Sequence, residues 1–73
     1  MTSSETTMHK IVSFTADFFG NQTEYVIEYC DGIERVIERM RDWAAYHGVI
    51  DNLSTDGLFF YFGAITFRAE QVR

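Results

Sequence analysis

The sequence predicts an α+β fold, a two-layer β-β-α-β-β arrangement in which a mainly antiparallel sheet carries one helix on one face. Three observations lead to this prediction. Apolar residues recur at helical spacing over residues 31–47, alternate with polar residues over residues 10–30, and form a dense run over residues 58–69. A chain of 73 residues is long enough for one small domain, which we expect to span residues 9–73. Residues 1–8 are mostly Thr and Ser without an apolar period, and a disordered tail is predicted there.

The helix is predicted over residues 31–47. Asp31 is the expected N-cap, Glu34 completes an acidic capping box, and Gly48 supplies a left-handed stop. The apolar residues of this segment follow the i, i+3, i+4, i+7 spacing of one buried face. They are Ile33, Val36, Ile37, Met40, Trp43 and Ala44.

A β-hairpin is predicted before the helix, with strands at residues 10–19 and 22–30. Gly20-Asn21 has the composition of a tight two-residue turn. With this turn the apolar residues of the two strands coincide, since Phe18 pairs with Thr23, Ala16 with Tyr25, Phe14 with Ile27 and Val12 with Tyr29. The opposite face of the hairpin then holds Ile11, Ser13, Thr15, Asp17, Glu24, Val26 and Glu28, with Asp17 facing Glu24.

Residues 58–69 are predicted to be extended, and two arrangements compete. In the first, Gly63-Ala64 turns a hairpin that pairs Phe62 with Ile65, Phe60 with Phe67 and Leu58 with Ala69. In the second, one long strand runs through a bulge at Gly63. We favour the hairpin, because it gathers the apolar residues onto one face. The predicted core is Val12, Phe14, Phe18, Tyr25, Ile27, Ile33, Val36, Ile37, Met40, Trp43, Ala44, Phe60, Phe62, Ile65 and Phe67.

The composition narrows the classes of partner. The chain has a formal net charge of −5, which opposes attraction to phosphate backbones and anionic lipids, so we expect neither a direct nucleic-acid partner nor a membrane. No apolar run approaches the ~20 residues that a membrane span needs. Cys30 is the only cysteine, and no signal-peptide pattern is present. Both features predict a cytoplasmic protein without disulfides.

No residues stand in a recognisable catalytic pattern. His9 and His47 lack the spacing of a metal site or a catalytic triad. Cys30 precedes the predicted helix, where a thiol can be activated, but a small apolar filler is the more common role. The five glycines suit turns and caps rather than a phosphate-binding loop. We therefore predict no enzymatic activity, no cofactor and no metal ion.

The apolar content exceeds what one helix can cover. Phe59 and Tyr61 are expected on the face of the sheet away from the helix, joined by Ile11 and Val26. A monomer rarely exposes such a patch, and aromatic residues beside an Arg are typical of interfaces. Shielding by the tail or by the stems of Arg and Lys is the competing interpretation.

Acidic residues form two further groups. Asp17, Glu24 and Glu28 are expected together on the outer face of the first hairpin, while Glu34 and Glu38 belong to an acidic stripe on the helix. An ordinary solvated surface is one interpretation, and a surface complementary to a basic groove of another protein is the other. The predicted partner-binding residues are Asp17, Glu24, Glu28, Glu34, Glu38, Phe59 and Tyr61.

In size, acidic charge and element order, the chain resembles the small phage-encoded inhibitors of the anti-CRISPR type. This resemblance implies a non-enzymatic inhibitor that binds a bacterial defence or nucleic-acid-processing complex by surface contact. It carries over no site residues. Two other hypotheses are a homodimeric structural or regulatory module whose open sheet faces pair, and a small-ligand-binding domain that uses an aromatic cavity.

Overall fold

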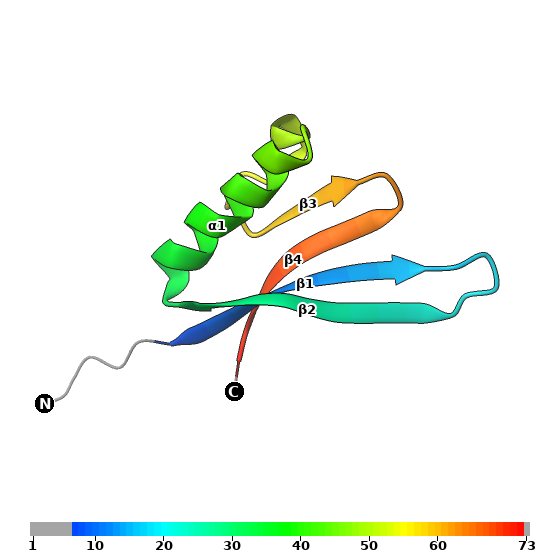
Figure 1. Ribbon diagram of the computed structural model, residues 1–73, viewed down its shortest axis with the longest axis horizontal. Coiled ribbons are helices and arrows are strands. Elements are labelled where there is room, and N and C mark those ends of the chain that lie inside the picture. The colour runs from blue at the N-terminus through cyan, green and yellow to red at the C-terminus, as the bar shows by residue number, and fades with distance from the viewer. Residues whose placement is uncertain (1–6, 73) are drawn as a thin grey trace, which may run out of the picture.

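A four-stranded antiparallel sheet with the strand order β2-β1-β4-β3 carries one helix, α1, packed on one face (Figure 1). The computed structural model describes residues 7–72 and confirms the predicted α+β class. The two hairpins, β1–β2 and β3–β4, join through the pairing of β1 with β4. The elements are β1 (Met8–Ala16), β2 (Gln22–Asp31), α1 (Ile33–Tyr46), the 3-10 turn η1 (Ile50–Asn52), β3 (Phe59–Phe62) and β4 (Ile65–Gln71).

Six residues of the predicted tail, 1–6, lie outside the described residues. Of the remaining two, Met8 begins β1 and pairs with Asp31. No helix in the described part of the chain is both long and apolar enough to span a membrane.

Helix α1 is shorter than predicted at its start. Asp31 is the last residue of β2, because its backbone belongs to the ladder with Met8, and Gly32 takes the N-cap position without a side-chain bond. The predicted capping box of Asp31 and Glu34 is therefore wrong. The predicted stop is confirmed: Gly48 has a φ of 74°, a left-handed conformation that glycine adopts without steric cost, and its N–H donates to the carbonyl of Ala45.

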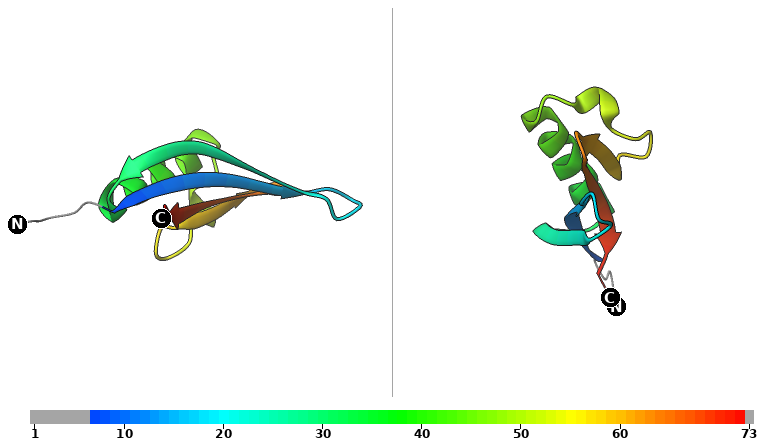
Figure 2. Two further views of the ribbon diagram at one scale, coloured as in Figure 1. Left: turned by 90° about the horizontal axis from the view of Figure 1, so that it is seen from below. Right: turned by 90° about the vertical axis from the view of Figure 1, so that its right-hand side faces the viewer.

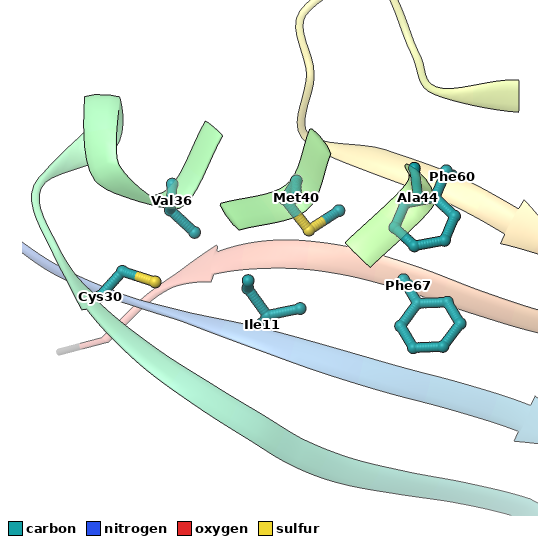
Figure 3. Packing of buried hydrophobic residues seen from close by; sticks show 7 residues of the cluster. All are labelled: Ile11, Cys30, Val36, Met40, Ala44, Phe60 and Phe67. Carbon is teal, nitrogen blue, oxygen red and sulfur yellow. The ribbon is translucent and has the colours of Figure 1, made fainter. Parts of the chain in front are cut away.

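The core lies between α1 and the sheet. Val36, Met40 and Ala44 point from the helix towards the strands, where Phe60 and Phe67 stack with ring centroids 4.7 Å apart and planes 9° apart (Figure 3). The spacing of four residues between the helical contacts is the period of one helical face. The full cluster is Ile11, Cys30, Val36, Met40, Ala44, Phe60 and Phe67.

The second hairpin has the predicted register. Phe62 pairs with Ile65 and Phe60 with Phe67, and the N–H of Ala69 donates to the carbonyl of Leu58 over 2.8 Å. The alternative of one long strand through Gly63 is wrong.

The first hairpin has a different register from the predicted one. Phe14 lies opposite Glu24 rather than Ile27, and residues 17–21 form a loop of five residues in place of a Gly20-Asn21 turn. Ile11 pairs with Glu28 while Val12 pairs with Val26, so Ile27 is an extra residue in a β-bulge.

The register is shifted from the predicted one by two residues on the Glu28 side of the bulge and by three residues beyond it, and α1 covers the face that carries Ile11 and Glu28 rather than the predicted face. Ile11 and Cys30 enter the core, whereas Val12 and Phe14 move to the opposite face, where Val12 is buried and Phe14 partly buried. Six predicted core residues are exposed instead: Phe18, Tyr25, Ile27, Ile33, Ile37 and Phe62.

Candidate interaction surface

The side of the sheet away from α1 has no layer over it among the described residues. We call it the open face; the left view of Figure 2 looks onto it, with α1 behind the strands. Because successive strand residues point to opposite sides, Ile11 in the core places its neighbour Val12 on the open face. Residues that pair across neighbouring strands lie on the same face, so the strand pairing assigns the residues of β2, β3 and β4 as well. The open face comprises Met8, Lys10, Val12, Phe14, Ala16, Gln22, Glu24, Val26, Tyr29, Asp31, Phe59, Tyr61, Thr66, Arg68 and Glu70.

Aromatic and aliphatic side chains cover much of the open face. Phe59 and Tyr61 are 38% and 52% exposed and form an edge-to-face pair with ring centroids 5.8 Å apart. Val26 is 41% exposed. The expectation that Phe59, Tyr61 and Val26 share the face opposite the helix agrees with these positions, whereas Ile11 lies in the core.

Arg68 lies at the centre of the open face. Its guanidinium carbon is 5.3 Å from the centroid of the Phe14 ring, a cation–π distance. Its Nη2 is 3.4 Å from a carboxylate oxygen of Glu24, and its Nε donates to Glu70 over 2.5 Å. Lys10 completes the chain of charges at 3.9 Å from Glu70. These two cations and two anions balance each other, and Asp31 at the end of β2 leaves the open face with a net charge of −1.

Glu28, a predicted partner-binding residue, lies on the helix side of the sheet. Its carboxylate accepts bonds from Arg39 Nε over 2.8 Å and from the indole N–H of Trp43 over 2.8 Å. Burial raises the pKa of Glu28, but these bonds outweigh burial and hold the pKa below its ordinary value. Glu28 thus joins β2 to α1, and the structure separates it from Glu24 on the open face.

Asp17 also has an internal role. Its carboxylate accepts from the backbone N–H groups of Phe19 over 2.9 Å and Asn21 over 2.8 Å, and from the side-chain amide of Asn21 over 3.0 Å. The bonds from Asn21, foremost its backbone N–H, lower the pKa of Asp17. Asp17 orders the loop of the first hairpin and does not face Glu24, so the predicted cluster of Asp17, Glu24 and Glu28 is not brought together.

The acidic residues of the helix are exposed, as expected for a solvated stripe. Glu38 pairs with Arg35 over 2.6 Å. Glu34 lies in the first turn of α1, one turn before Glu38. Because the open face carries a net charge of only −1, most of the formal net charge of −5 comes from residues outside it. The predicted site residues consequently fall on separate surfaces: Phe59, Tyr61 and Glu24 on the open face, Glu34 and Glu38 on the helix.

The tip of the β1–β2 hairpin is a second apolar feature, although its Phe18 was expected in the core. Phe18 and Phe19 are 95% and 85% exposed, and their rings contact each other edge to face at 5.5 Å. The tip reaches beyond the β3–β4 turn (Figure 1). The polar composition of Asp17, Gly20 and Asn21 around these two rings was the available sign of a longer loop.

A groove of about 980 Å³ lies between the start of α1 and the loop of residues 53–57. Ile33, Ile37 and Leu53 contribute apolar surface, and Glu34 and Arg41 contribute charge. Among residues 7–72, no three His, Cys, Asp or Glu side chains are grouped so that they could hold a metal ion. Burial raises the pKa of the Cys30 thiol, the opposite of what an activated nucleophile needs.

Comparisons with known proteins add no further constraint. No protein-family model, no curated protein and no solved structure matches this chain.

Proposed function

We propose that this chain is a non-enzymatic protein-binding protein whose open face packs against another polypeptide. The observation that carries the proposal is the exposed aromatic group of Phe59 and Tyr61 on a face that α1 does not cover. Val26 extends the same surface onto β2. Fully burying a large apolar side chain contributes about 1.5–3 kcal/mol, so covering this face would add substantially to the free energy of binding to a partner.

The composition of the open face also suits an interface. Aromatic residues and Arg are enriched where binding energy concentrates, and charged groups at such positions are usually paired. Here Arg68 is paired with Glu24 and Glu70 and lies over the ring of Phe14. A partner would therefore find the central cation already neutralised, which reduces the cost of removing it from water.

Site-specific photocrosslinking in cells tests this function even while the partner is unidentified. A benzophenone amino acid at position 61 should crosslink to one discrete polypeptide, because position 61 lies within the surface. The same group at position 46, on the exposed end of α1, is the matched control. Equal crosslinking at the two positions, or none at either, would reject the open face as an interface.

The finer proposal is that the protein inhibits a bacterial defence or nucleic-acid-processing complex in the cytoplasm, as the likeness to anti-CRISPR proteins suggests. Its support is the acidic surface outside the open face, which would steer the protein towards a basic target. Glu34 is the cleanest residue for a test of steering, because charge reversal at Glu24 or Glu28 would also break an internal pair.

Phage plating tests the inhibitor proposal directly. Bacteria whose CRISPR system targets a phage should be plated with that phage, with and without expression of this chain. Inhibition predicts that the chain restores plaque formation, and that Glu34→Lys weakens the restoration. If strains representing each CRISPR type stay resistant while the chain is expressed in soluble form, the anti-CRISPR proposal is wrong.

A further inference from the structure

We infer that the occupant of the open face is a second copy of this chain, so that two sheets pack face to face in a symmetric homodimer. The inference rests on the proposed function in one respect: it takes the open face as the interface and names its partner. Three features of the described residues support it, namely the charge of the face, the state of the sheet edges and the available area.

The charge of the open face favours self-association there. Lys10 and Arg68 are balanced by Glu24 and Glu70, and all four side chains are linked by ion pairs. The chain as a whole carries −5, so two copies that approached through another surface would bring excess negative charge together. Two open faces, each with a net charge of −1 from Asp31 at the end of β2, meet with a smaller penalty. A basic partner would be attracted less strongly to the open face than to the acidic surface of the rest of the molecule.

The edges of the sheet are poorly suited to pairing between copies. The edge strand β2 contains the bulge at Ile27, which interrupts a regular ladder, and it presents Glu24 and Glu28 on either side of that bulge. The other edge, β3, has four residues, and the carbonyl of Tyr61 already accepts a bond from Asn52 over 3.0 Å. Bulges, charges and short edge strands are the devices by which proteins prevent sheet extension. The face is therefore the better surface for a second copy.

The area of the open face is close to the lower limit for a specific dimer. The four strands have 10, 9, 7 and 4 residues, and each residue takes up about 3.4 Å along its strand and about 4.8 Å across it. The footprint is then about 490 Å² per copy, or about 980 Å² for the pair, against the roughly 1,000 Å² of a small specific interface. Sheets pack face to face at about 10 Å, a separation that side chains such as Phe59 and Tyr61 fill. We expect a concentration-dependent dimer rather than an obligate one.

Sedimentation velocity of the full chain tests the inference. Wild-type protein should shift from monomer to dimer between about 1 µM and about 500 µM. Val26→Glu and Tyr61→Glu each add an unpaired carboxylate to the face and should weaken dimerisation by about 30-fold or more. Circular dichroism and thermal melting show whether each variant is folded, and only folded variants are compared.

A double substitution of Phe18→Ser and Phe19→Ser is the matched control. It removes the two most exposed rings of the chain, yet the hairpin tip lies outside the open face, so the dimer should persist. A monomeric wild type over the whole concentration range would overturn the inference. So would a dimer that survives Val26→Glu and Tyr61→Glu, or one that the tip variant abolishes.

The two proposals fail in different ways. If wild type stays monomeric but position 61 crosslinks to a foreign protein, the second copy is excluded and the open face remains an interface. If position 61 crosslinks no polypeptide at all, both proposals fall. A crosslinked band at twice the mass of the chain, together with a dimer in sedimentation, supports both.

Discussion

The two faces of the sheet carry similar residues in different surroundings. On the helix side, Phe60 and Phe67 stack beneath α1 and are buried; on the open side, Phe59 and Tyr61 contact each other and remain partly exposed. Phe59 and Phe60 are neighbours on β3 and are the same residue type, yet Phe60 is buried and Phe59 is partly exposed. The comparison shows that burial, rather than residue type, decides how much an aromatic residue of this sheet contributes to the stability of the fold. A partly exposed ring keeps apolar surface that a partner could cover.

Aromatic truncation should give the largest contrast between the faces. Phe60→Ala leaves a cavity under α1 and should lower the free energy of unfolding by about 3–5 kcal/mol. Phe59→Ala removes a side chain that is already partly in water and should cost about 1 kcal/mol. Urea unfolding at a protein concentration where the chain is monomeric measures both. Equal losses would mean that the two faces contribute alike to stability.

Neutralising a carboxylate should also lower the unfolding free energy more on the helix side than on the open face, but by a smaller amount. Glu28→Gln breaks the ion pair with Arg39 on the helix side and should cost about 1–2 kcal/mol of unfolding free energy. Glu24→Gln removes the longer contact with Arg68 on the open face and should cost less than about 0.5 kcal/mol. The same urea titration compares them, and a greater loss for Glu24→Gln would contradict the helix-side role of Glu28.

The pH dependence of stability sharpens the role of Glu28. Its pKa is lower in the folded protein than in the unfolded chain. The stabilisation it supplies is therefore complete above its unfolded pKa and is lost as the pH falls through the lower folded pKa. The difference in unfolding free energy between wild type and Glu28→Gln should shrink between about pH 6 and about pH 3. A difference that stays constant over this range would show that the ionised carboxylate is not what stabilises the contact.

The smallest effect on global stability is expected at the hairpin tip, which belongs to neither face. Asp17→Ala removes the acceptor for the backbone N–H groups of Phe19 and Asn21. Amide hydrogen exchange of the loop should become faster, while exchange in α1 should not change, because local opening of the hairpin tip leaves the core intact. Faster exchange throughout the protein would indicate that the tip is coupled to the core.

The two hairpins differ in how well their registers could be predicted, and the reason is physical. In the second hairpin, a two-residue turn at Gly63-Ala64 left one register that placed Phe60 against Phe67. In the first, both sides of the strands carry apolar residues, with Ile11 beside Val12 and Val26 beside Ile27. Alternation alone could not choose between the faces of such strands.

Tertiary contacts made that choice. The carboxylate of Glu28 meets Arg39 and Trp43, which lie 11 and 15 residues further along the chain, and this places Glu28 on the helix side. The same register sends Phe18 and Phe19 to the tip, away from the core where Phe18 was predicted. Of the candidate site, Phe59 and Tyr61 followed from the register of β3, whereas the acidic cluster depended on the incorrect register of the first hairpin and was wrong.

The sequence by itself determined the element order, the burial of Val36, Met40 and Ala44 on α1, the end of α1 at Gly48 and the β3–β4 pairing, because each depends on neighbours within a few residues. Only the tertiary structure decided the register of β1 with β2, the bulge at Ile27 and the membership of the open face. These depend on which side of a two-sided apolar hairpin the helix covers. That choice is a balance of long-range packing and ion pairing, which no local pattern records.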